Sequence, residues 1–192
     1  RFYGLMFLGG YEPAPPVFDE YGYLTPPGPH KGSLCHIRLH FVEGIIPSES
    51  RPWLFRDMLG IIRKFKYLLP TDCFQVWVGG IFISNKPEPE CTKICLVIDH
   101  EAFNDADEHT RAALTKLMRP YEDVTHMAEL IRQDMNCDVH LLLEDPDSSS
   151  PSYLSDLYFK KMIGNLFRLG GDKHPKGYFI CNIEGIIEDD TE

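Results

Sequence analysis

Five residues at the ends of apolar segments could take part in chemistry. A Gly79-Gly80 pair follows one such segment, and backbone N–H groups in a glycine turn can face an anion. Lys93 and Cys95 stand two residues apart in a second segment, so on a strand they point to one face. Asp138 begins a third segment. An ammonium cannot ligate Mg²⁺ and a thiol is too soft a ligand for this ion, so Lys93 and Cys95 would not hold it. These residue types therefore favour anion binding at the turn over metal-dependent catalysis.

Other polar residues have simpler interpretations. Glu88 and Glu90 lie in a Pro-rich segment, where we expect solvated loop charges rather than a rigid site. Asp99 follows the end of an apolar segment and is expected to cap the next turn. His140 alternates with apolar residues, which is typical of a core or edge histidine. The sequence contains no P-loop, Rossmann fingerprint or Ser-His-Asp order.

Hydrophobic periodicity predicts the elements that position these residues. The clearest helix spans Ser50–Leu69, with Ser50 as its N-cap. The region Leu34–Glu43 is ambiguous between helix and strand. Further elements are predicted as strands at Cys73–Val78, Ile94–Ile98, Cys137–Leu143 and Tyr178–Ile183, and as helices at Ala106–Met118 (capped by Asn104 or Asp105), Tyr121–Met135 and Tyr153–Leu169. This order predicts an α/β (α+β) fold, a mixed sheet with its flanking helices on one face.

Composition and charge limit the classes of function. A chain of 192 residues with 43% hydrophobic and 25% charged residues fits one globular domain. We divide it into an extended Pro/Gly-rich segment over residues 1–33, a domain over 34–184 and an acidic tail over 185–192. The net charge of −10 argues against nucleic-acid binding. No apolar run reaches the length of a membrane span, and we expect a cytoplasmic protein.

Two motifs near the chain ends resemble those of a known family. The first is Phe18-Asp19-Glu20-x-Gly22-x-Leu24-x-Pro26-Pro27-Gly28-x-His30, and the second is Pro175-Lys176-Gly177-Tyr178. Together they are similar to a bacterial and phage family of nucleotidyltransferase-like proteins. The resemblance covers about Phe18 to Ile183 and implies a polymerase-β-like fold. In that fold a glycine turn cradles the nucleotide triphosphate, and three strand carboxylates bind two divalent metals about 4 Å apart.

This chain departs from the family pattern where the chemistry would occur. Ile81 follows the Gly79-Gly80 turn in place of a hydroxyl residue. Lys93 and Cys95, or in a shorter register Cys91 and Lys93, fill the positions of the two paired carboxylates. Only the third carboxylate remains, as Asp138. As one hypothesis, the Lys93 ammonium pairs with Asp138 and substitutes for the lost cation; a distance above about 6 Å would exclude this.

The resemblance and the departures together imply a pseudoenzyme. We expect a degenerate nucleotidyltransferase-like protein that is not an enzyme, needs no cofactor and acts through protein–protein interaction or through a nucleotide held at Gly79 and Gly80. The family implies a toxin–antitoxin or antiviral (phage-defence) setting. Two alternatives are open. One is an active nucleotidyltransferase with Mg²⁺ bound by Asp138 together with Glu88, Glu90 or Asp99, and the other is a structural subunit of a larger assembly.

Overall fold

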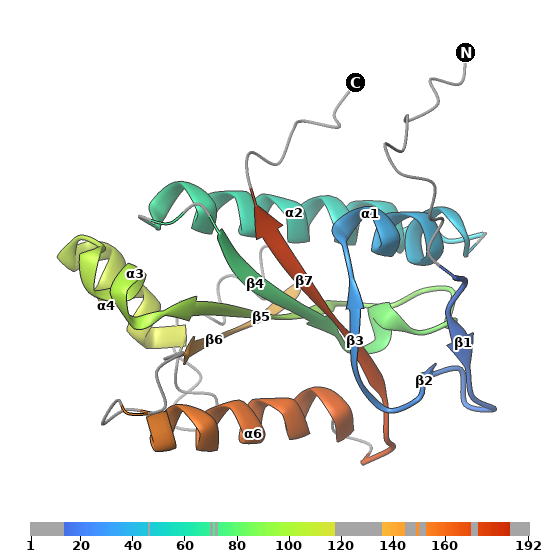
Figure 1. Ribbon diagram of the computed structural model, residues 1–192. Coiled ribbons are helices and arrows are strands. Elements are labelled where there is room, and N and C mark those ends of the chain that lie inside the picture. The colour runs from blue at the N-terminus through green and yellow to red at the C-terminus, as the bar shows by residue number, and fades with distance from the viewer. Residues whose placement is uncertain are drawn as a thin grey trace.

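A five-stranded mixed sheet forms the centre of the protein (Figure 1). The computed structural model describes residues 14–45, 47–69, 71, 73–117, 136–144, 149, 153–169 and 173–184. The strand order is β3-β7-β4-β5-β6. These strands are β3 (Gly28–Gly32), β4 (Cys73–Gly79), β5 (Thr92–Asp99), β6 (Cys137–Glu144) and β7 (Gly177–Glu184). The mixed sheet and all four strands predicted from periodicity are thus confirmed.

Strand β4 is antiparallel to both of its neighbours, whereas the two outer pairs are parallel. Strands β4 and β5 form the expected hairpin, with Val76 opposite Leu96. A short 3₁₀ turn, η2 (Ile81–Ile83), follows Gly80 in the connection between them. The parallel partner of β5 is β6, reached after the helices α3 (His100–Asp105) and α4 (Glu108–Leu117).

Helices cover both faces of the sheet (Figure 1). On one face lie α1 (Leu34–Ile37), the π-helical turn η1 (Arg38–Glu43) and α2 (Ser50–Leu68). On the other lies α6 (Tyr153–Leu169). The expectation of helices on one face is therefore wrong. The physical reason is that consecutive residues of β5 and β6 are buried, so both faces of these strands are apolar. Each face then needs a covering layer of helices.

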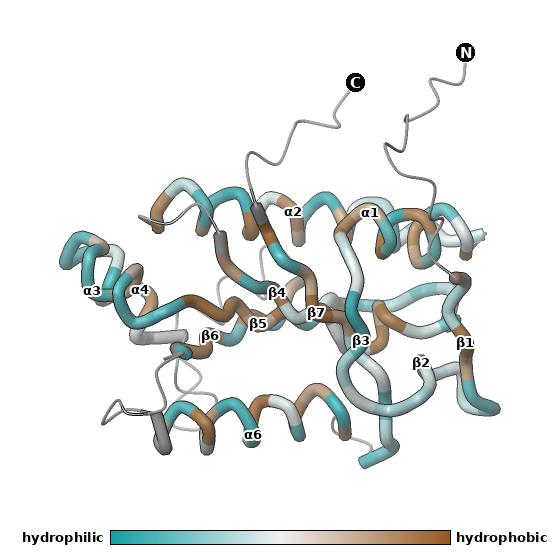
Figure 2. The backbone as a smooth tube through the Cα atoms, viewed as in Figure 1, coloured by the Kyte–Doolittle hydropathy of each residue, from teal (hydrophilic) through white to brown (hydrophobic). Residues whose placement is uncertain are grey.

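Two apolar clusters correspond to the two faces. The larger one contains Met58 and Ile62 of α2 packed against Val76, Ile94 and Leu96 of the sheet. The smaller one lies under α6 and comprises Trp77, Cys95, Val97, Leu142, Ile163, Phe167 and Tyr178. Figure 2 shows hydrophobic segments of the central strands between the two helical layers. The second cluster fixes the position of α6 over the part of the sheet where the candidate site lies.

Helix α2 begins in a different way from the sequence prediction. Its N-cap is Glu49, not Ser50, and Glu49 makes no side-chain capping bond. Instead Glu88, from the β4–β5 connection, accepts the backbone N–H groups of Glu49 at 2.9 Å and Ser50 at 3.0 Å. A carboxylate at a helix N-terminus satisfies free N–H groups and interacts favourably with the helix dipole. Because this carboxylate comes from residue 88, the local sequence could not reveal it.

Several other boundaries also differ from their predictions. The ambiguous region Leu34–Glu43 is helical, as α1 and η1. The helix predicted to begin at Ala106 begins at Glu108, and Asp107 rather than Asn104 or Asp105 accepts the N–H of Thr110 at 3.0 Å. Near the N-terminus, β1 (Val17–Phe18) and β2 (Leu24–Thr25) form a small ribbon. The predicted helix Tyr121–Met135 and the acidic tail lie outside the described residues.

Candidate functional site

Gly79, Lys93 and Asp138 form one row across β4, β5 and β6, at the end of the sheet where β4 finishes and β5 and β6 begin. The strand register pairs Gly79 with Lys93 and Lys93 with Asp138. The Lys93 Nζ lies 3.5 Å from the Asp138 Oδ2, and the two side chains are 20% and 36% exposed. The pairing predicted from the sequence is confirmed. At this exposure the pair contributes at most about 1 kcal/mol, so its significance lies in where it puts the positive charge.

His140 adds a third titratable group to this row. It stands two residues beyond Asp138 on β6 and faces the same side, with its Nε2 3.3 Å from the Asp138 Oδ2. The side chain is 10% exposed, and its Nε2 makes no hydrogen bond of good geometry to any described residue. The sequence interpretation as a core histidine is correct about burial. It missed the proximity to Asp138, which the alternation of side chains along β6 could have indicated.

Cys95 lies beside this row but inside the core. It is fully buried, and burial raises the pKa of its thiol far above the usual range. Its neighbours in the smaller cluster include Trp77 and Phe167. Its thiol is protonated at neutral pH and packed among apolar side chains, so Cys95 itself is not a metal ligand here.

Both glycines of the turn have a steric role in this fold. A Cβ on Gly79 would lie 2.7 Å from the Phe167 ring of α6, which is closer than carbon atoms can approach. Gly80 has a φ of +77°, a backbone conformation that is strained for any residue with a Cβ atom. A Cβ there would also lie 3.2 Å from the Cβ of Lys93. Packing against α6 and turn geometry explain the glycine pair without a ligand.

Two of the remaining candidate carboxylates serve as helix caps. Glu88 caps α2, and Glu90 is exposed in the loop. Asp99 caps α3, accepting the N–H of Ala102 at 2.6 Å, as its position after a strand predicted. Within the described ranges, no three His, Cys, Asp or Glu side chains are grouped so as to hold a metal ion. With an ammonium 3.5 Å from Asp138, these residues do not fit the pair of Mg²⁺ ions of the nucleotidyltransferase pattern.

The two terminal motifs meet at the beginning of β7. Gly28 donates its N–H to the carbonyl of Lys176 at 3.0 Å, and β3 then runs parallel to β7. A Cβ on Gly177 would lie 2.7 Å from His30 Nε2. Asp19 accepts the backbone N–H of Tyr23 at 2.9 Å, and its other oxygen lies 3.0 Å from His174 Nε2. The motif residues thus join the two ends of the domain. This is a structural role, and the motif pattern in the sequence does not by itself indicate it.

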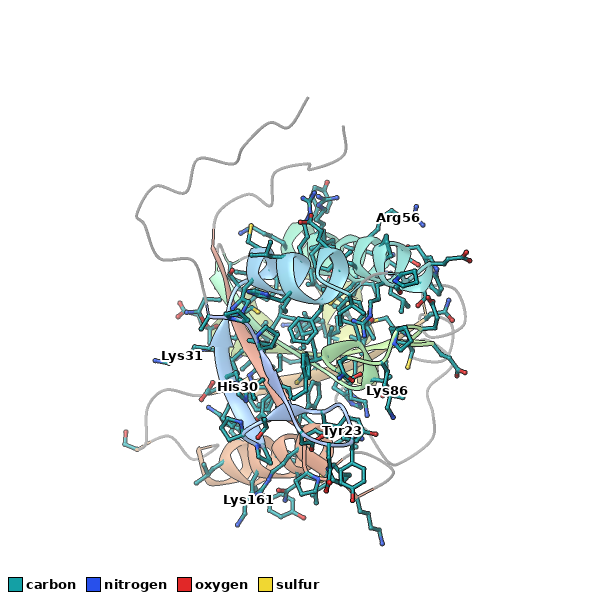
Figure 3. All side chains as sticks on the ribbon, turned by 90° about the vertical axis from the view of Figure 1, so that its right-hand side faces the viewer. Tyr23, His30, Lys31, Arg56, Lys86 and Lys161 are labelled. Carbon is teal, nitrogen blue, oxygen red and sulfur yellow. The ribbon has the colours of Figure 1, made fainter. Side chains whose placement is uncertain are left out.

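Tyr23 of the first motif also collects positive charge. Lys86 Nζ lies 4.8 Å and Lys176 Nζ lies 4.4 Å from the centre of its ring, distances typical of cation–π contacts. Lys86 additionally donates to the Tyr23 hydroxyl at 3.1 Å. Figure 3 shows Lys86 next to Tyr23 on this side of the molecule. Neither lysine was a candidate from the sequence, because no spacing rule connects residues this far apart.

A family model matches residues 16–180, a range that includes both motifs and the row from Gly79 to Asp138. It describes a family of unknown function, DUF6932. The chain belongs to this family. No curated protein and no solved structure matches the chain.

Membership of DUF6932 agrees with the extent of the structural unit, because the match begins before β1 and ends within β7. The family description assigns no activity, so function has to be argued from the site itself. In the described part of the chain, none of the helices is both long and apolar enough to cross a membrane.

Proposed function

We propose that this protein is a catalytically degenerate nucleotidyltransferase-like domain that acts by binding a nucleotide or a protein partner. The observation that carries the proposal is the Lys93–Asp138 pair, with its 3.5 Å separation, at the edge of the sheet. In the nucleotidyltransferase-like family that the sequence resembles, a divalent cation would bind at this place. The toxin–antitoxin or phage-defence setting and the protein partner belong to the same proposal.

The electrostatic argument is direct. Two-metal catalysis requires several carboxylate oxygens that converge on two cations. Lys93 instead brings a fixed positive charge to the one carboxylate in the row, and a like charge at this distance repels an incoming Mg²⁺. His140 is the next group along β6 and supplies no negative charge.

No observation favours the alternative of an active enzyme with an unusual ligand set. Asp99 stands six residues beyond Lys93 on β5, which corresponds to about 20 Å along an extended strand. Glu88 is engaged with the N-terminus of α2. Recruiting either side chain to Asp138 would require the hairpin or the helix to be rebuilt.

A charge-reversal experiment tests the proposal. The wild-type protein is incubated with Mn²⁺ and labelled nucleotides, and bound Mn²⁺ is measured by electron paramagnetic resonance. We expect neither nucleotidyl transfer nor site-specific Mn²⁺ binding. In Lys93→Asp, two carboxylates face each other across β5 and β6, and we expect Mn²⁺ binding to appear together with a rise in the melting temperature on adding the ion.

Lys93→Met is the matched control, because it removes the ammonium without adding a carboxylate. It should show no gain of Mn²⁺ binding comparable to that of Lys93→Asp. Nucleotidyl transfer by the wild-type protein that disappears in Asp138→Ala would contradict the proposal and favour the enzyme alternative.

A further inference from the structure

A groove runs between α6 and the β3 side of the sheet, and its lining includes neither Lys93 nor Asp138. Its volume is about 580 Å³. Trp77, Tyr178 and Ile180 of the sheet line it together with Pro27, Gly28 and Pro29 at the beginning of β3, and α6 contributes Leu157, Lys160, Lys161, Gly164, Asn165 and Arg168. The volume is within the range of pockets that bind small organic molecules, about 300–1,000 Å³.

The charge of the groove is opposite to that of the whole chain. Three cationic side chains line it, and among the described residues that line it none is acidic. This occurs in a chain with a net charge of −10. Lys160 pairs with Glu144, whereas Lys161 and Arg168 are exposed along the rim. Figure 3 shows Lys161 extending from α6. A local positive field above an apolar floor selects for an anionic ligand.

The floor of the groove is aromatic. Trp77 is 2% exposed and Tyr178 is 5% exposed, and their ring centroids lie 5.4 Å apart. The indole Nε1–H of Trp77 is buried and has no hydrogen-bond partner among the described residues, so the floor offers a ligand ring surface for packing rather than this donor. A phenol is protonated at neutral pH, and burial raises the pKa of Tyr178 further above its usual range.

We propose that this groove binds a small organic anion: a flat, apolar body that packs on the floor, joined to a phosphate, sulfonate or carboxylate at the Lys161 and Arg168 rim. An acidic peptide is the competing occupant. A peptide that extended the sheet would pair with the N–H groups of β3, but Pro27 and Pro29 have none. The inference rests on the proposed binding role but not on the chemistry of Lys93, so the two can fail separately.

The two tryptophans make a sharp readout possible. Trp77 lines the groove, while Trp53 packs against the other face of the sheet, in the cluster under α2. Their indole N–H signals in a ¹H–¹⁵N spectrum can be assigned with Trp53→Phe. The probe is 8-anilinonaphthalene-1-sulfonate, and its neutral counterpart N-phenyl-1-naphthylamine lacks the sulfonate. We expect the anion to shift the Trp77 signal in a saturable manner, to leave Trp53 unchanged, and to bind at least about tenfold more tightly than the neutral molecule.

Matched variants separate the groove from general charge effects. The double variant Lys161→Gln/Arg168→Gln should weaken binding about tenfold or more. Arg56→Gln/Lys64→Gln removes the same charge from exposed positions on α2 and should leave binding unchanged. Figure 3 shows Arg56 and Lys161 on opposite sides of the sheet. Gly164→Leu should abolish binding by filling the groove from the helix side, with folding checked by circular dichroism.

Several outcomes would overturn the proposal. These are an unmoved Trp77 signal at millimolar probe, equal affinity for the charged and neutral probes, or equal weakening by the two double variants. A shift of Trp77 by an alternating Glu-Phe peptide, without any shift by the sulfonate, would assign the groove to a peptide instead. None of these results would alter the outcome of the Mn²⁺ experiment on Lys93.

Discussion

The two faces of the sheet hold their charged groups in different surroundings. Under α2 the core is large and contains the fully buried Arg51, whose two terminal guanidinium nitrogens donate to backbone carbonyls while its Nε has no partner among the described residues. Under α6 the core is small, and Lys93, Asp138 and His140 lie next to it. There the buried nitrogens of Trp77 and His140 make no hydrogen bonds to described residues. Buried nitrogens without a hydrogen-bond partner among the described residues also occur near α2, at His36, His40 and Arg51, so such atoms do not distinguish the two faces. The difference lies in the charged side chains: hydrogen bonds to several carbonyls hold Arg51 inside the α2 core, whereas Lys93 and Asp138 next to the α6 core remain partly exposed. The α2 face therefore contributes more to stability, and the α6 face is where binding should be sought.

Arg51 offers the largest test of this difference. Its guanidinium donates at 2.8 Å to the carbonyls of Phe41, Phe82 and Ser84, and also to that of Lys86, so it connects η1 and the β4–β5 connection to α2. Burial lowers its pKa to about 10, which leaves it charged at neutral pH. Arg51→Met would leave four carbonyls without this donor. We expect a loss of about 3–5 kcal/mol in the free energy of unfolding, measured by urea denaturation.

Arg56→Met is the control for this prediction, because the Arg56 side chain is 71% exposed and its contact with Asp57 is 3.6 Å long. Its effect should remain within about 0.5 kcal/mol. If the two arginine variants lost similar amounts of stability, the α2 face would not have the role described above.

Gly79 provides the second test, on the α6 face. Gly79→Ala would bring a Cβ to 2.7 Å from the Phe167 ring, and we expect a destabilisation of about 2 kcal/mol by urea denaturation. Gly164→Ala is the matched change within α6, where the new Cβ would meet the Tyr178 hydroxyl at an ordinary 3.7 Å. That variant should gain up to about 1 kcal/mol, because alanine favours a helix more than glycine does.

A smaller residue at position 167 should rescue Gly79→Ala. In a double-mutant cycle with Phe167→Leu, the two changes should be less destabilising together than the sum of their separate effects. Additive effects, or a Gly79→Ala protein of wild-type stability, would mean that the glycine is present for a ligand rather than for packing.

The sequence predicted the central strands and α2 because local periodicity determines them. The Lys93–Asp138 contact was one hypothesis, based on the positions that these residues take in the family pattern, and the distance of 3.5 Å agrees with it. The sequence did not predict that α6 covers a second face, because strands apolar on both sides cannot reveal which helix covers which side. Arg51 could have been noticed: it lies three residues before Leu54 and seven before Met58, on the apolar stripe of α2. The contacts of Glu88 with α2 and of Lys176 with Tyr23 depend on tertiary structure alone.

His36 gives the smallest and most specific test of the α2 face. Its ring lies 5.1 Å from Phe179 and 4.8 Å from His40. Burial, and secondarily the charge of His40, lower its pKa below the ordinary 6.5. The folded protein therefore keeps His36 neutral at pH values where the unfolded chain binds a proton, so stability falls as the pH decreases through 6.5. Between about pH 7.5 and about pH 5.5, the melting temperature of His36→Gln should decrease less than that of the wild type. The difference between the two decreases should be no more than about 2 °C. His109→Gln, at an exposed position on α4, should follow the wild type. If His36→Gln showed the same decrease as the wild type, burial would not be keeping the His36 imidazole neutral, and this side chain would not contribute to the pH dependence of stability.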